Sequence, residues 1–214
     1  MEKESQTIFD KNVIEFVTVS AEFCAFLERA DSIPRNKFID TSLKLLPLLY
    51  LKAAMLPPCE QIGEELPERY VTEDIYEMIR TKLAGLLAEK DDYLDVFVQD
   101  MEYSDQPIKK NISEDLADIY QDIKDFVFVF QLGLNETMND ALVICQENFG
   151  QFWGQKLVNT LRALHDAMYN VEDETEEENN YESDDEDCQC GEDCHCHDHE
   201  GHCHEDGCHC QDEK

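Results

Sequence analysis

The chain has 214 residues, with 50 acidic and 17 basic side chains and a formal net charge of −33. Nucleic acids and anionic membranes bind proteins through Lys and Arg, so neither is an expected partner, whereas metal cations and a basic protein are. No cationic, apolar secretory segment opens the sequence, and no apolar run is long enough to span a bilayer. We therefore expect a cytoplasmic protein, in a reducing compartment where clustered cysteines indicate metal binding more often than disulfides.

Charge divides the chain into a body and a tail. Residues 171–214 hold 19 acidic side chains and one basic one, a local charge of −18, whereas residues 1–170 carry −15. We predict a helical domain over 1–170, an acidic disordered linker over 171–187 and a Cys/His-rich metal-binding tail over 188–214. A body of this length buries about 70% of its unfolded surface and needs no disulfide or metal to fold.

Apolar residues in the body recur at spacings of three and four, which predicts helices. The expected helices lie at 8–31, 34–55, 73–87, 113–130, 135–147 and 149–169. Thr72 and Ser113 are the expected N-caps of the third and fourth of these helices, and Pro47 is expected to kink the second. Residues 91–112 show no period and are expected to form a long connection. The predicted fold class is all-α, a single bundle of about six helices with a disordered acidic C-terminal tail.

Two local features of the body are compatible with more than one interpretation. The run FVFVF at 126–130 has strand propensity, and we expect packing within the bundle to make it helical. Gly150 and Gly154 flank a single Trp153, and close helix packing explains these glycines better than the approach of a ligand. Trp153 is expected to anchor the core.

The strongest candidate site in the body is a row of aspartates. Their spacing of three, four and three places Asp115, Asp118, Asp122 and Asp125 on one face of the fourth helix. This acidic row could dock a basic protein or hold a hard cation. The alternative is a solvated flank on a very acidic protein, which is the usual meaning of a charge run.

No catalytic motif is present in the body, so we expect the protein not to be an enzyme. The phosphate-binding glycine loop, the G-x-S-x-G elbow and the H-E-x-x-H motif are all missing. His165 is the single histidine of the body, and Arg162 stands where a ferritin-type Glu-x-x-His motif requires Glu. A capping or packing role is expected for His165, rather than a nucleophilic pair with a cysteine.

Four stretches of the body resemble a known family. They are LPLLYLKA (46–53), DDYLDVF (91–97), SEDLADIYQDIKD (113–125) and FGQFWGQKLVNTLRALH (149–165). In these stretches the sequence resembles the bacterial domain-of-unknown-function family 5063 over about residues 8–170, with the tail outside the similarity. The resemblance implies an all-helical fold and implies no activity.

The tail holds the densest group of metal ligands. Seven cysteines and six histidines fall within the 23 residues from Cys188 to Cys210. The predicted metal ligands are Cys188, Cys190, Cys194, His195, Cys196, His197, His199, His202, Cys203, His204, Cys208, His209 and Cys210. The pattern predicts binding of transition-metal ions, with Zn(II) expected first and Cu(I) or Ni(II) as alternatives.

Two functions follow from these features. In the first, the protein buffers, stores or delivers a transition metal through its tail. In the second, the helical body is an interaction module that docks another protein through the acidic row, with the tail as an accessory. An acidic extension that binds metal only in vitro is the simplest alternative for the tail. The sequence does not indicate the oligomeric state.

Overall fold

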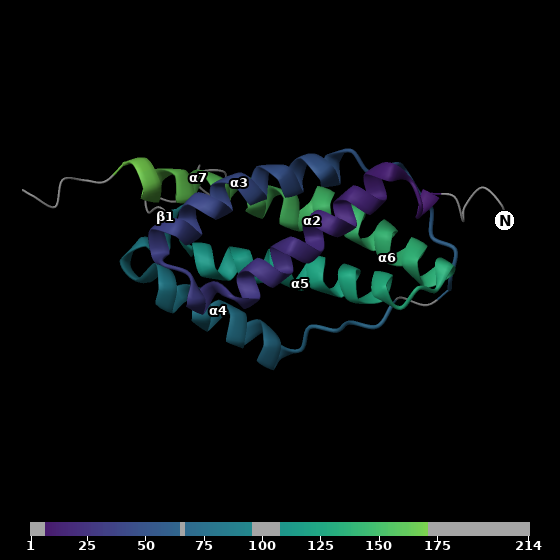
Figure 1. The fold of residues 1–214 in the computed structure, drawn as a ribbon, viewed down its shortest axis with the longest axis horizontal. Helices are drawn as coiled ribbons and strands as arrows, with labels where there is room; N and C mark the ends of the chain where they lie inside the picture. The colour runs from purple at the N-terminus through teal and green to yellow at the C-terminus, as the bar shows by residue number, and fades with distance from the viewer. Residues whose placement is uncertain (1–6, 65–66, 96–107, 171–214) are drawn as a thin grey trace, which may run out of the picture. The chain divides into compact units, whose positions relative to one another are not determined.

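A computed structural model describes residues 7–64, 67–95 and 108–170, which form a helical bundle with one short hairpin (Figure 1). The α-helices are α2 (Lys11–Glu28), α3 (Arg35–Ala54), α4 (Glu73–Leu87), α5 (Ile112–Gln131), α6 (Asn135–Asn148) and α7 (Gly154–Tyr169). Short 3-10 turns η1 (Ala30–Ser32) and η2 (Ala88–Lys90) follow α2 and α4. The all-α fold class and each of the predicted helices are confirmed.

Helix α5 lies at the centre of the bundle and packs against α2, α4, α6 and α7, while α3 packs against α2 and α7 (Figure 1). Its inward face carries large apolar side chains, among them Ile119, Ile123 and Phe126. Burial of this face explains why 126–130 is helical despite its strand propensity, because a helix places Phe126, Val127 and Val129 in the core together.

Side-chain caps mark the starts of two helices, and the cap at Thr72 had been predicted from the sequence. The Thr72 hydroxyl accepts from the backbone N–H of Ile75 at 3.4 Å and caps α4, whose first turn carries two acidic residues at the positive end of the helix dipole. At α2 the Asp10 carboxylate accepts from the N–H of Asn12 at 2.8 Å. Helix α3 continues through Pro47.

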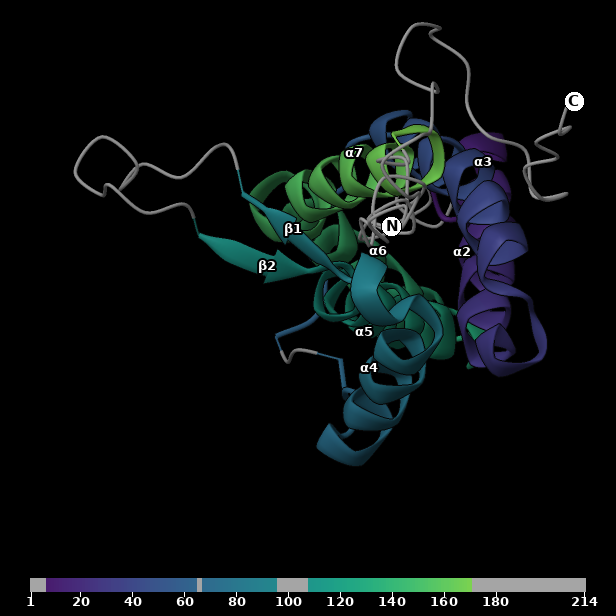
Figure 2. The same ribbon diagram turned by 90° about the vertical axis from the view of Figure 1, so that its left-hand side faces the viewer.

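The expected long connection over 91–112 contains a short hairpin that the sequence did not predict. Strand β1 (Asp92–Leu94) pairs antiparallel with β2 (Lys109–Asn111), with Tyr93 opposite Lys110 (Figure 2). Strands of three residues, mostly polar, show too little alternation to be recognised from the sequence.

The prediction that Ser113 is the N-cap of α5 was wrong. Helix α5 begins at Ile112, so Ser113 is its second residue, and the N-cap Asn111 makes no side-chain capping bond. The carboxylate that binds the first turn comes from Asp91, which precedes β1 and lies 22 residues away in sequence from Ser113.

The last two predicted helices follow one another through a single π-helical turn, η4 (Phe149–Trp153). The N–H of Gly154 donates to the carbonyl of Phe149, and a Cβ on Gly154 would lie 2.4 Å from that oxygen. Close packing is therefore confirmed for Gly154. Gly150 is exposed, and a Cβ there would meet no atom within 4 Å, so the same expectation was wrong for Gly150.

Candidate functional site

The acidic row on α5 faces its neighbouring helices more than solvent. Asp115 is 3% exposed, and Asp118, Asp122 and Asp125 are half-buried. The interpretation of this row as a solvated flank is therefore wrong. Each of the four carboxylates accepts a hydrogen bond from a residue outside α5. The row therefore connects the hairpin, α4, α6 and the segment before α4 to α5.

Tyrosine hydroxyls and one lysine bind the first two aspartates of the row. The Tyr93 hydroxyl of β1 donates to Asp115, and the Tyr76 hydroxyl of α4 donates to Asp118 at 2.9 Å. Lys156 of α7 forms an ion pair with Asp118. Burial, reinforced by the carboxylate partner, raises the pKa of both tyrosines, which keeps them protonated as donors. These contacts join the hairpin, α4 and α7 to α5.

Backbone and amide groups bind the last two aspartates of the row. Asn148 at the end of α6 donates through its side chain to Asp122 at 2.7 Å. Asp125 accepts from the N–H groups of Tyr70 and Val71, both at 2.8 Å, and so holds the segment that enters α4. Because these carboxylates already have donors within the body, the acidic row is not a free face for a basic partner.

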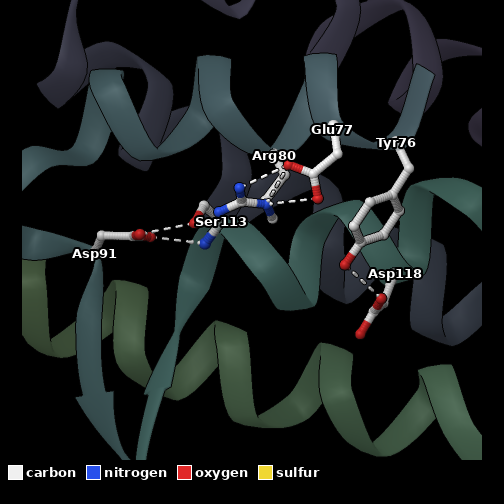
Figure 3. A network of polar contacts seen from close by, with 6 residues as sticks. All are labelled: Tyr76, Glu77, Arg80, Asp91, Ser113 and Asp118. Carbon is white, nitrogen blue, oxygen red and sulfur yellow. Dashed lines mark hydrogen bonds and ion pairs between the residues drawn. The ribbon is translucent and has the colours of Figure 1, made fainter. Parts of the chain in front are cut away.

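Asp91 and Ser113 form a second buried contact beside the α4–α5 interface (Figure 3). One carboxylate oxygen of Asp91 accepts from the Ser113 N–H at 2.7 Å, and the other accepts from the Ser113 hydroxyl at 2.7 Å. The N–H of Ile112 donates to the Asp91 carbonyl at 2.8 Å. A single residue thereby fixes the start of α5 to the start of the hairpin. On α4, Glu77 and Arg80 pair on the exposed side.

Glu28, at the end of α2, is the centre of a third polar cluster. Its carboxylate accepts from the Tyr120 hydroxyl at 3.0 Å and from Lys124 Nζ at 2.6 Å. Lys82 of α4 donates to the Glu28 carbonyl at 2.7 Å. The cluster ties α2 to α4 and α5, and its chemistry is that of a structural ion pair with satisfied partners.

The three body thiols are poor nucleophiles. Burial raises the pKa of Cys24 to about 12 and that of Cys59 to about 11, and it raises the pKa of Cys145 well above its ordinary value. The Cys59 thiol donates to the Gln146 side-chain carbonyl at 3.0 Å. His165 is exposed, and its ring contacts the Tyr169 ring at 4.7 Å between centroids. The packing role expected for His165 therefore agrees with this contact.

Potential metal ligands do not cluster in the part of the body that the structure describes. Within residues 7–64, 67–95 and 108–170, no group of three or more His, Cys, Asp or Glu side chains could hold a metal ion. All thirteen predicted metal ligands between Cys188 and Cys210 lie outside the described residues. The same holds for the predicted acidic linker over 171–187.

Sequence reasoning found the acidic row but missed the residues that bind it. Nothing in the local sequence distinguishes Tyr76 and Tyr93 from other partly buried tyrosines. Lys156 lies 38 residues from its partner Asp118. The one usable signal was the stretch DDYLDVF, which contains both Asp91 and Tyr93 and contributed to the family resemblance. Periodicity could not reveal these pairings, because they depend on which elements pack together.

We expect the free energy of unfolding to rise as the pH falls towards 3.8, the ordinary pKa of an aspartate. Burial raises the pKa of Asp115, Asp122 and Asp125 above the ordinary 3.8, so the folded state binds protons more readily than the unfolded chain. Their stabilising contribution is complete below the ordinary value and is lost as the pH rises through the raised values. Urea unfolding of the full chain with a chelator, followed by the fluorescence of its single tryptophan, measures the trend.

The variant that tests this pH dependence is Asp122→Asn, whose amide oxygen can still accept from Asn148. It should flatten the pH dependence. The pKa of exposed Glu77 is lowered by its hydrogen bond with Arg80, so Glu77→Gln should leave the trend above its ordinary pKa of 4.5 unchanged. An unaltered slope in Asp122→Asn would show that general charge repulsion, not this carboxyl, causes the effect.

The fold and its internal polar clusters define an all-α domain built around one central helix. Over residues 7–170 the chain matches the family described as domain of unknown function DUF5063, and it belongs to that family. The resemblance noted in the sequence is therefore confirmed. No curated protein matches the chain.

A solved relative supports the same fold. The chain is 71% identical to protein BF1032 from Bacteroides fragilis, whose crystal structure it matches with a TM-score of 0.70. The match covers 78% of this chain and 98% of that chain, so about a fifth of the present sequence has no counterpart there. Among the described residues, no helix is long and apolar enough to cross a membrane.

Proposed function

We propose that this protein is a cytoplasmic transition-metal-binding protein that buffers, stores or delivers its ion through residues 188–214. One observation carries the proposal, the occurrence of seven cysteines and six histidines within 23 residues. More than half of these positions are soft or borderline ligands. The helical DUF5063 body carries the tail and supplies no metal cluster from its described residues.

The spacing of the ligands favours several adaptable sites over one rigid site. C-x-C occurs at 188/190, 194/196 and 208/210, and H-x-H occurs within 195–199 and at 202/204. Paired C-x2-C units with a long insert, which build a structural zinc finger, do not occur in the tail. Thirteen ligands in four-coordinate sites could hold about three ions.

Charge and protonation also support metal binding by the tail. Neighbouring carboxylates disfavour thiolates, so the metal-free cysteines stay protonated near neutral pH. A divalent ion relieves the repulsion between acidic side chains and releases protons as it binds. Zn(II) is the proposed ion, with Cu(I) or Ni(II) as the alternatives that thiolate and imidazole ligands allow.

The body thiols do not compete for the same ion. Cys24 and Cys145 are buried, and the raised pKa of each keeps it protonated. Cys59 is half-buried and hydrogen-bonded to Gln146. This burial supports the seven tail cysteines, rather than the body thiols, as the proposed thiolate ligands.

Native mass spectrometry of the reduced full chain, titrated with Zn(II), Ni(II) and Cu(I), tests the proposal. We expect two or more tightly held ions per chain, with binding that weakens steeply as the pH falls below neutral. The matched control keeps every carboxylate and replaces the seven tail cysteines by Ser and the six histidines by Asn. It should hold none of these ions while keeping the helical circular dichroism of the parent.

Two results would count against the proposal. If the control variant binds as many ions as the parent, the carboxylates rather than the Cys and His ligands hold them. If the full reduced chain binds none of the three ions at micromolar concentrations, the tail is an acidic extension without a metal-handling role.

A further inference from the structure

Two segments of this acidic protein contain no acidic residue. The chain has 50 Asp and Glu in 214 residues, yet residues 41–59 and 148–165 contain neither. The first segment forms most of α3 and its C-terminal exit, and the second forms η4 and most of α7. They are the two longest stretches of the chain without an acidic residue.

The fold brings the two segments together. Helices α3 and α7 pack side by side and run antiparallel along one side of the bundle (Figure 1). The ring of Tyr50 meets the ring of Phe149 edge-on, with centroids 5.0 Å apart. The two packed segments, neither of which contributes a carboxylate, form what we call the α3/α7 face.

The α3/α7 face exposes large apolar side chains. Leu51 is 52% exposed and Phe152 is 57% exposed. The other exposed large apolar residues of these two segments are Leu48, Tyr50, Met55 and Val158. Charged groups lie around them, including the Lys44–Asp40 ion pair, Arg162 and Asp166. An apolar and aromatic centre with a polar rim is the usual composition of a protein–protein interface.

The lysines of this face are already neutralised. Lys44 pairs with Asp40 at 2.6 Å, Lys52 pairs with Glu15 at 2.5 Å, and Lys156 pairs with Asp118. A nucleic acid or an anionic lipid surface would need several unpaired cations, and Arg162 alone adds little. The face is therefore close to neutral and favours an apolar occupant.

We propose that the occupant is a second copy of this chain, which makes the protein a homodimer through its α3/α7 faces. Two chains that each carry −33 repel one another wherever carboxylates meet. At this face they can approach without opposing carboxylates at the centre. A two-fold contact also lets Arg162 of one chain approach Asp166 of the other at the rim, because an isologous interface repeats each pairing.

Sedimentation velocity of the full chain tests this proposal. Chelator and reductant are present to exclude bridging of two chains by metal ions or disulfides. We expect a species of twice 24.9 kDa at about 50 µM protein. The dimer should strengthen as salt is raised, because salt screens the repulsion between the chains. Leu51→Glu and Phe152→Glu should each weaken dimerisation at least about 100-fold by placing a carboxylate in the contact.

The control variant is Met78→Glu, at a residue of α4 that is equally exposed at 52% and lies outside the face. It should dimerise like the parent, and all three variants should keep the parent's circular dichroism because the replaced side chains are exposed. A parent that stays monomeric, or a dimer indifferent to Leu51→Glu and Phe152→Glu, would overturn the proposal. Binding to phosphatidylglycerol vesicles without self-association would instead assign the face to a membrane.

Discussion

Trp153→Ala is expected to lower the free energy of unfolding by about 3–5 kcal/mol. The side chain is fully buried at the π-helical turn and packs against the ring of Phe149 at 4.7 Å between centroids. Its indole N–H also donates to the Cys145 carbonyl at 3.1 Å, which satisfies a buried acceptor near the end of α6. The loss therefore combines a cavity with a broken hydrogen bond, at the turn that joins α6 to α7.

Urea unfolding followed by far-ultraviolet circular dichroism measures this loss, since the variant lacks the only tryptophan. Trp153→Phe keeps most of the ring volume but not the N–H, and a smaller loss of about 1–2 kcal/mol is expected. The adjacent Phe152 is exposed, and Phe152→Ala should change the stability of the monomer by less than about 0.5 kcal/mol. A similar effect at both positions would contradict the assignment of Trp153 as the core anchor.

Asp91→Ala is expected to lower the free energy of unfolding by about 2–4 kcal/mol. It removes both acceptors of Ser113, a residue that is only 1% exposed, and leaves its N–H and hydroxyl without them. It removes the side-chain tie between Asp91 and the first turn of α5 but leaves the bond from the Ile112 N–H to the carbonyl of residue 91. Hydrogen exchange should be faster at Ser113 than in the parent chain.

The neighbouring Asp92 supplies the control for this prediction. Its exposed carboxylate accepts from the Asn111 side chain at 2.7 Å and pairs with Lys109 across the hairpin. Asp92→Ala should change stability by less than about 1 kcal/mol, because exposed ion pairs contribute little. Equal losses at Asp91 and Asp92 would show that the hairpin as a whole, not the buried cap, stabilises the start of α5.

Helix positions were predictable because a helix buries one face, and that face repeats in the sequence every three to four residues. Burial of Trp153 and the capping role of Thr72 could be predicted for similarly local reasons. The hairpin could not, because its two strands are short and their pairing joins residues 15 to 19 positions apart. The role of Ser113 was misassigned because its acceptor comes from a distant part of the chain.

The acidic row shows the same division between local and non-local information. Its spacing placed four aspartates on one face of α5, and the structure confirms that shared face. Whether the face meets water or protein depends on what packs there. Donors from the hairpin, α4, α6 and α7 converge on it, and none of them is adjacent to the row in sequence.

The all-α class, the helix positions and the metal-ligand composition of the tail can be read from the sequence, since each depends on residues close together in the chain. Tertiary structure alone decided that the acidic row is internal, that Asp91 caps α5, and that two acid-free segments form one exposed apolar face. These three properties arise from the packing of segments far apart in sequence. Periodicity and composition carry no information about such packing.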